Sequence, residues 1–340
     1  LLCAMLVPAR AHGEPAAGFP VDTLLATLRT RSVHRHHVNW EAAAAELRTR
    51  VAGASDDESC ARAVVALFER MGDVHSVFTH AGRSYSHYDA LPDTVRARLL
   101  PMLDREREQA GRVESSWLTG DHAYVRVPSM DAWTPEQVQA LTEQLYAQVN
   151  RLAAQKPRGW LIDLRLNGGG NLYPMLAGLA PVLGTGVVGG TVDADGREVQ
   201  SWVLKPDGLY WRDAGGDRRF AGLDPVMRER RVPLPAAVLV GPVTRSSGQA
   251  VAMAFRGRAR TVLIGEPTAR GYTTVTAPFV LGERTTLLLA VGSMRDRRGD
   301  VHESELLPDV NVYGGDDFES PLQDRKVRAA LEWLRHQGGR

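Results

Sequence analysis

Apolar positions recur with helical spacing in the first part of the chain, which predicts helices over residues 20–72. Residues 40–47 are rich in strong helix formers. A further helix is predicted to begin after Asp56, whose side chain can cap it, and to end at Gly72. Residues 73–78 then alternate between polar and apolar side chains, as a short strand does.

Further along the chain, short apolar runs alternate with amphipathic segments. Strands are predicted at 123–128, 160–165, 236–240, 261–265, 274–281 and 285–292, and helices at 94–109, 134–154, 172–183, 246–257 and 325–335. Hairpin turns are predicted at Gly189-Gly190, Asp195-Gly196 and Asp207-Gly208. This alternation predicts an α/β fold, with a helical N-terminal subdomain at 12–112 and the core at 113–340.

Composition and charge change this picture only by exclusion. The 340 residues are 44% hydrophobic and 24% charged, which is typical of globular proteins and excludes disordered and fibrous classes. The formal net charge is +1, so neither nucleic acid nor a membrane surface is expected as a partner. No apolar run reaches the length of about 18 residues that a membrane span requires.

The first residues have the pattern of an export signal. Leu1 to Pro8 is mostly apolar, and Ala9-Arg10-Ala11 fits a secretory cleavage site. We interpret residues 1–11 as a signal-peptide remnant, which predicts a secreted or periplasmic protein; the alternative is the frayed apolar end of a cytosolic one. Cleavage would remove Cys3 and leave Cys60 alone, which excludes an internal disulfide in the mature chain.

Ser246 stands between an apolar run typical of a strand and a run of helix-forming residues. A serine at such a turn exposes its oxygen, and the positive end of the helix supports developing negative charge, so Ser246 is a candidate nucleophile. The alternative is a helix cap, which is a common role of serine at a helix start. Ser246 and Ser247 could divide these two roles.

The run Asn167-Gly168-Gly169-Gly170-Asn171 also lies between a predicted strand and a predicted helix. Its backbone N–H groups could form an oxyanion hole. A phosphate-binding turn and a plain tight turn are the alternatives. The Walker and Rossmann patterns are both absent from this run.

A histidine is the expected base for a serine nucleophile in this chain. Neither small-residue turn contains any of the three lysines, Lys156, Lys205 and Lys326. His75 lies on a segment that resembles the end of a half-buried strand, and a neutral imidazole is suited to removing a serine proton. The histidines at 34, 36 and 37 are interpreted as a polar loop, because no ligand partner stands at metal-site spacing. A metal hydrolase is therefore disfavoured, and no cofactor is expected.

Taken in this order, the motifs resemble those of peptidase family S41, the C-terminal-processing and tricorn-like serine peptidases. The resemblance covers most of the chain and rests on the segments Gly72 to Ser76, Asp163 to Gly170, Thr244 to Gly248, Gly265 to Ala269 and Pro308 to Val310. It implies a crotonase/ClpP-like α/β core and acyl transfer through a serine.

The resemblance also assigns roles by position. It makes Ser246 the nucleophile and gives the oxyanion hole to backbone N–H groups of Gly169, Gly170 and Ser247. It implies an acidic third member shortly before Pro308-Asp309, for which Glu303 is the choice, with Glu305 in reserve and Asp73 as a local alternative.

The base distinguishes two branches of the family. One branch uses a lysine after Gly265-Glu266, but here that segment contains Arg270 and no lysine, and arginine does not deprotonate at usable pH. The other branch takes its base from an Asp-x-His motif, which is Asp73-Val74-His75 in this chain. The resemblance therefore implies a Ser246–His75 pair.

This chain departs from the family pattern in three places. Gln249 stands where a glutamate often follows the nucleophile turn, and the segment before Pro308 is about a residue shorter than expected. Only residues 79–112 stand where many members insert a PDZ domain, which is too few for such a domain. Capture of a substrate C-terminus by a PDZ domain is therefore not expected.

We expect a serine peptidase that cleaves peptide or protein substrates through an acyl-enzyme. A non-catalytic ligand-binding or scaffold protein with the same fold, and a carboxylesterase with the same triad, are the alternatives. The sequence indicates neither the natural substrate nor the oligomeric state. Candidates for the specificity pocket, by proximity to the motifs, are Trp160, Leu172, Tyr173 and Tyr272, although core packing explains these residues equally well.

Overall fold

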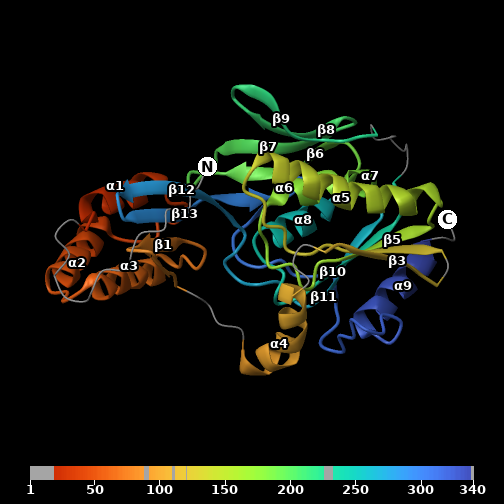
Figure 1. Ribbon diagram of the computed structural model, residues 1–340, viewed down its shortest axis with the longest axis horizontal. Coiled ribbons are helices and arrows are strands. Elements are labelled where there is room, and N and C mark those ends of the chain that lie inside the picture. The colour runs from red at the N-terminus through yellow and green to blue at the C-terminus, as the bar shows by residue number, and fades with distance from the viewer. Residues whose placement is uncertain (1–18, 88–91, 109–111, 120, 226–232, 338–340) are drawn as a thin grey trace.

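The computed structural model describes residues 19–87, 92–108, 112–119, 121–225 and 233–337. The predicted signal-peptide remnant at 1–11 lies outside these residues. Figure 1 shows a helical N-terminal part and a larger α/β part, joined by a long two-stranded ribbon. The N-terminal helices are α1 (Val21–Arg31), α2 (Trp40–Ala52) and α3 (Asp57–Met71), and the ribbon consists of β12 (Thr274–Gly282) and β13 (Thr285–Arg295).

A six-stranded, mostly parallel sheet forms the centre of the α/β part. Its order is β15-β11-β10-β5-β4-β3, in which β3 alone runs antiparallel to its neighbour. The strands span Glu114–Leu118 (β3), His122–Arg126 (β4), Gly159–Asp163 (β5), Ala236–Val240 (β10), Thr261–Gly265 (β11) and Val310–Asn311 (β15). The apolar runs of β5 and β10 fit this place, because a parallel sheet is buried on both faces.

Helices cover both faces of this sheet. Trp160 and Ile162 of β5 share one core with α5 (Pro135–Ala154), α6 (Leu172–Gly178), α7 (Ala180–Leu183) and α8 (Ser247–Phe255). Leu161 faces the other way and packs with α9 (Arg325–Gln337). Consecutive residues of one strand thus reach opposite cores, as the alternation of side chains along a strand requires.

A second, antiparallel sheet links the two parts of the molecule. Its order is β2-β1-β13-β6-β7-β8-β9, with β12 and β14 also pairing with β13. The strands span Val77–His80 (β1), Arg83–Tyr85 (β2), Gly186–Val192 (β6), Glu198–Lys205 (β7), Gly208–Asp213 (β8), Gly216–Gly222 (β9) and Val301–His302 (β14). Leu281, Leu287 and Leu289 of the ribbon pack among the N-terminal helices. The ribbon is therefore part of the N-terminal hydrophobic cluster and of the sheet beside the core.

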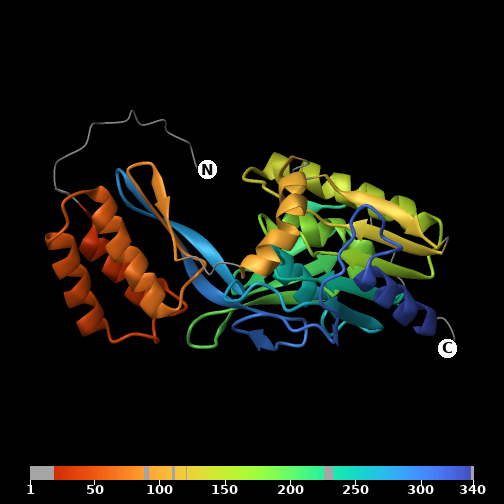
Figure 2. The same cartoon turned by 90° about the horizontal axis from the view of Figure 1, so that it is seen from below.

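Helix α4 (Asp93–Glu108) follows the N-terminal part in sequence and lies against the α/β part, as the two views agree (Figures 1 and 2). None of the helices in the described ranges is long and apolar enough to cross a membrane.

Local signals of helix ends are confirmed, and one predicted hairpin is wrong. The Asp56 carboxylate accepts from the Ser59 N–H, and Gly72 has φ +71°, as its predicted position after a helix requires. Gly189-Gly190 lies inside β6 instead of in a turn. A Cβ on Gly189 would lie 2.8 Å from the Trp202 ring, so close packing explains a glycine there.

Candidate active site

The carboxyl ends of three parallel neighbours, β5, β10 and β11, meet at one edge of the central sheet. β5 leads into the glycine run, β10 leads into the turn that ends at Ser246, and β11 leads into the segment 266–274. This edge is where open α/β sheets usually bind ligands. The topology therefore brings together two of the motifs that the sequence singled out.

Ser246 has a backbone conformation that non-glycine residues rarely adopt. Its φ is +51° and its ψ is −122°, directly before the first residue of α8. The Ser246 N–H donates to Gln249 Oε1 over 3.1 Å. The buried Gln249 in turn donates from Nε2 to Thr268 Oγ1 and to the Ala269 carbonyl, each over 2.7 Å. An uncharged glutamine thus fixes the serine turn to the segment after β11, with no buried charge to compensate.

The Asn167 side chain links the glycine turn to the segment after β4 by hydrogen bonds. Its Oδ1 accepts from the Gly169 N–H over 2.9 Å, and its Nδ2 donates to the carbonyls of Val127 and Pro128. A Cβ on Gly169 would lie 2.9 Å from Ser246 Cβ and 3.3 Å from Ser246 Oγ. Glycine at 169 is therefore what allows the turn to approach the serine this closely.

The three predicted oxyanion donors differ in availability. The Gly169 N–H is engaged by Asn167. Among the described residues, the Gly170 N–H has no hydrogen-bond acceptor. The Ser247 N–H, at the start of α8, has none outside that helix. The Ser247 hydroxyl donates to the Gly170 carbonyl over 2.6 Å, which ties the two turns together.

His75 reaches this edge from the N-terminal part of the chain. Its ring packs edge-on against Tyr272, with 5.1 Å between ring centroids. The guanidinium of Arg245, the residue before the candidate nucleophile, lies 5.6 Å from the centroid of the same Tyr272 ring. Tyr272 thus lies between the segment of the predicted base and the turn of the predicted nucleophile.

Asp73 shapes the backbone that presents His75. Its Oδ1 accepts from the N–H groups of His75 and Ser76, over 3.0 and 2.9 Å, and its Oδ2 accepts from the Ser76 hydroxyl. The Ser76 hydroxyl in turn accepts from the Ala290 N–H of β13. The predicted strand at 73–78 is therefore a carboxylate-held turn up to Ser76, and β1 begins only at Val77.

The surroundings of His75 favour its neutral form. Burial lowers the pKa of His75 to about 4; the charge of Asp73 opposes this shift, whereas the charges of Arg245 and His34 add to it. A neutral imidazole can accept a proton, so His75 is in the state that a general base requires at neutral pH.

Thr274, at the start of β12, is the hydrogen-bond partner of the imidazole. Its Oγ1 lies 2.8 Å from His75 Nδ1. Glu303 is exposed, and neither it nor Glu305 forms a hydrogen bond or ion pair with His75 in the part of the chain that the structure describes. A threonine therefore occupies the place beside the ring where an acidic third member was expected.

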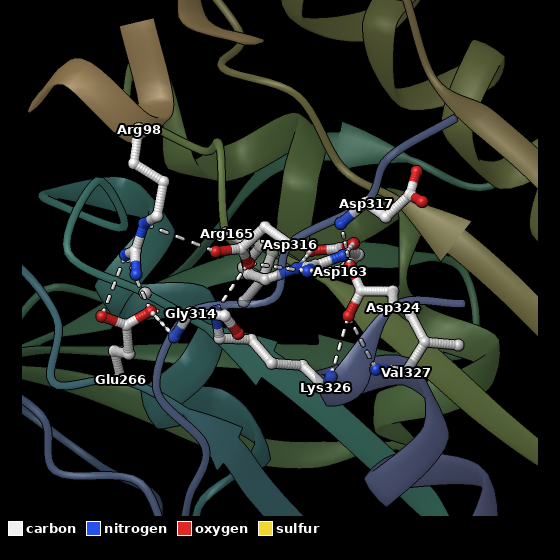
Figure 3. Close-up of polar contacts among 12 residues, drawn as sticks. Arg98, Asp163, Arg165, Glu266, Gly314, Asp316, Asp317, Asp324, Lys326 and Val327 are labelled. Carbon is white, nitrogen blue, oxygen red and sulfur yellow. Dashed lines mark hydrogen bonds and ion pairs between the residues drawn. The ribbon is translucent and has the colours of Figure 1, made fainter. Parts of the chain in front are cut away.

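A largely buried network of charges, drawn in Figure 3, includes Asp163 and Arg165, which stand just before the glycine turn in the chain. Arg165, two residues before Asn167, contacts three carboxylates, those of Asp163, Asp316 and Asp324. Lys326 bridges Asp316 and Glu266, over 2.6 and 2.8 Å. Arg98 of α4 donates to both carboxylate oxygens of Glu266, over 2.9 and 3.0 Å. The network thus connects α4 to the strand ends that carry the glycine turn and the segment 266–274.

The structure brings the glycine turn and Ser246 to one sheet edge and His75 against Tyr272 beside it, but sequence reasoning missed the side chains that contact them. Thr274 and Arg245 carry no motif of their own, and Lys326 is a buried structural residue. Of the specificity candidates, Tyr272 contacts His75, whereas Trp160 belongs to the hydrophobic core. Within the described ranges, no group of three or more His, Cys, Asp or Glu side chains could hold a metal ion.

Comparison with known proteins identifies a family and several relatives for this chain. The profile of "Peptidase family S41" matches residues 121–312. The "Nisin-resistance protein" of Lactococcus lactis subsp. lactis is 26% identical over 180 residues, which cover 53% of this chain and 50% of that relative. The match therefore spans only about half of the relative's length.

Two solved structures share the fold at low sequence identity. A lipoprotein from Streptococcus agalactiae has a TM-score of 0.66 and 19% identity, over 94% of this chain and 96% of the other. A candidate peptidase from Parabacteroides merdae has a TM-score of 0.59 and 13% identity, over 93% of this chain and 97% of the other. The similarity to both extends over the N-terminal helical part as well as the α/β part.

Proposed function

Because this chain belongs to peptidase family S41, we propose that it is a serine peptidase in which Ser246 is the nucleophile and His75 the general base. One observation carries the proposal: the fold brings His75, from the N-terminal part, to the Tyr272–Arg245 contact beside a serine with φ +51°. Strained residues of this kind cluster at functional sites.

The proposed chemistry needs no group beyond this chain, the substrate and water. His75 Nδ1–H donates to Thr274, which leaves Nε2 to accept the Ser246 proton as Oγ attacks the peptide carbonyl. The N–H groups of Gly170 and Ser247 stabilise the oxyanion. The imidazolium then protonates the leaving amine, and water hydrolyses the acyl-enzyme by the same route. Glu303 stays a prediction for the acidic member.

Rapid labelling by a fluorophosphonate tests the proposal, because only an activated serine reacts quickly with it. We expect label on Ser246, identified by mass spectrometry, and its loss in both Ser246→Ala and His75→Ala. Folded wild-type protein that stays unlabelled across pH 6–9 would favour the binding-protein alternative. Label that survives His75→Ala would keep the serine but contradict the choice of base. Peptide and ester substrates then separate a peptidase from a carboxylesterase.

The pH dependence of labelling provides a second prediction. Because the pKa of His75 is lowered to about 4, we expect the acid limb of the rate to lie well below the ordinary histidine value of about 6.5. Arg245→Met removes a charge that lowers this pKa, so its acid limb is expected at higher pH than that of wild type. Arg270→Met, at an exposed cation of the neighbouring segment, is the matched control. An unchanged limb in Arg245→Met would contradict the assignment of the limb to His75.

Thr274 is proposed to orient the imidazole. Thr274→Val removes the hydroxyl and keeps the shape, so kcat/KM is expected to fall about tenfold, the value of one hydrogen bond, with KM little changed. Thr274→Ser is expected to restore most of the rate. Glu303→Gln in the same assay decides between the two partners: a larger loss there than in Thr274→Val would return the orienting role to Glu303.

The relatives suggest where the peptidase acts and which substrate to test first. One solved relative is a lipoprotein and another relative is a nisin-resistance protein, so we propose an extracytoplasmic location and nisin as a first trial peptide. The nisin-resistance protein is 26% identical and is matched over half of its length, so cleavage of a peptide library is the experiment that identifies the natural substrate.

A further inference from the structure

A stack of three aromatic rings lies next to the glycine turn. Tyr173 of α6 lies 4.4 Å from Phe220 of β9, and Phe220 lies 5.3 Å from Trp211 of β8, between ring centroids. The Arg218 guanidinium covers this stack, 5.5 Å from the Trp211 centroid and 5.1 Å from the Phe220 centroid. The β8–β9 hairpin contacts α6 and lies at the edge of the second sheet (Figure 1).

Arg218 differs from the other cations of its hairpin in having no carboxylate partner among the described residues. Arg212 pairs with Asp217 and Arg219 with Asp207, and Lys205 of the neighbouring β7 also pairs with Asp217. A guanidinium stacked on rings keeps its N–H edge available, and this planar edge matches a carboxylate.

A second group in the stack also lacks an acceptor. The Trp211 indole Nε1 is buried and has no hydrogen-bond partner in the part of the chain that the structure describes. Buried donors are nearly always paired in folded proteins. The Arg218 side chain covers this indole, so the same cluster holds an unpaired cation and an unpaired donor.

The stack is connected to the proposed active site by a short run of residues. Asn171 directly follows Gly170, and its Oδ1 accepts from the Tyr173 N–H over 2.9 Å. Gly170 contacts the Ser247 hydroxyl through its carbonyl. Residues 170–173 thus lead from the proposed oxyanion turn to the aromatic stack.

We propose that Arg218, held on the rings of Trp211 and Phe220, binds a carboxylate of the peptide substrate at a fixed distance from the scissile bond. This inference rests on the proposed peptidase function. The carboxylate comes from an acidic side chain or from the C-terminus of the substrate, and both present the same planar anion to the guanidinium. Substrate selection would then depend on this carboxylate.

Peptide capture tests the inference without turnover. Immobilised Ser246→Ala protein is incubated with a proteome-derived peptide library, and retained peptides are compared with those retained by Ser246→Ala/Arg218→Gln. We expect enrichment of Asp and Glu at one position if the carboxylate is a side chain, and retention without that enrichment if it is the C-terminus; in both cases retention decreases about tenfold or more in the Arg218→Gln protein. Arg218→Lys is expected to retain part of the enrichment. Ser246→Ala/Arg219→Gln removes the same charge one residue away and is expected to retain all of it.

Matched synthetic peptides then distinguish the two sources of the carboxylate. Loss of binding on Glu→Gln exchange identifies a side chain, and loss on C-terminal amidation identifies the terminus. Capture that is equal with and without Arg218, or lost equally with Arg219→Gln, overturns the inference. Fluorophosphonate labelling of wild-type protein reports the nucleophile separately, so failure of the serine mechanism and failure of the carboxylate site give different results.

Discussion

Gly169→Ala is expected to reduce the rate of Ser246 labelling and of peptide cleavage about 1000-fold, the loss typical of a displaced oxyanion donor. The added Cβ would lie 2.9 Å from Ser246 Cβ, closer than folded proteins tolerate, at a φ of +107° that strains any L side chain. Relief of this contact moves either the serine or the neighbouring Gly170 N–H away from the attacked carbonyl. The measurement is kcat/KM, together with circular dichroism to verify folding.

Gly168→Ala is the matched control for this prediction. Its Cβ would approach no atom closer than 3.4 Å, and its φ lies outside the positive range. We expect activity within about threefold of wild type, since small changes away from strained or close-packed positions have small effects. Equal losses in the two variants would mean that the turn is sensitive as a whole, and full activity of Gly169→Ala would remove the turn from the catalytic geometry.

Lys326→Met is expected to lower the free energy of unfolding by about 3–5 kcal/mol, as removal of one partner from a buried ion pair does. The Lys326 ammonium donates to Glu266 and Asp316, and Lys326 is only 1% exposed. Without it, Arg98 and Arg165 face four carboxylates, so buried negative charge is left uncompensated. Urea unfolding at neutral pH measures the effect.

Lys205→Met is the control, because this half-buried lysine pairs with Asp217 near the surface and its loss is expected to cost less than about 1 kcal/mol. A pH series adds a second readout. Burial raises the pKa of Glu266, but hydrogen bonds from Lys326 and Arg98 outweigh it and lower that pKa below its ordinary value. The resulting stability is present above the ordinary glutamate pKa and is lost as pH falls through the lowered one. The difference in free energy of unfolding between wild type and Lys326→Met should therefore become smaller at acid pH.

The elements that sequence predicted correctly are those whose cause is local. The apolar runs of β5 and β10 require burial on both faces, and Thr134 has the hydroxyl that caps α5 through the Gln137 N–H. The positions of the glycine turn and of Ser246 were also predictable, because each directly follows such a buried strand. Parallel pairing of β5 with β10 then brings the two motifs together.

The features that sequence missed depend on contacts between distant segments. His75 meets Thr274 only because β1 and β12 both pair with β13, and nothing in either sequence segment specifies that register. The pairing of Arg98 with Glu266 likewise joins residues that no local pattern relates. The division at residue 112 stays a prediction, although the β12–β13 ribbon packs with the helices that precede that boundary.

The proposed base and nucleophile come from opposite sides of the boundary of the family match, since His75 precedes residue 121 and Ser246 lies within 121–312. A protein that inherited only the matched stretch would carry the serine turn without the residue proposed as its proton acceptor. On the proposed mechanism, such a protein would lack hydrolytic activity while keeping the serine turn. Relatives of this chain should accordingly be sorted by whether they retain the segment from Asp73 to Ser76, and only then by their similarity around the serine.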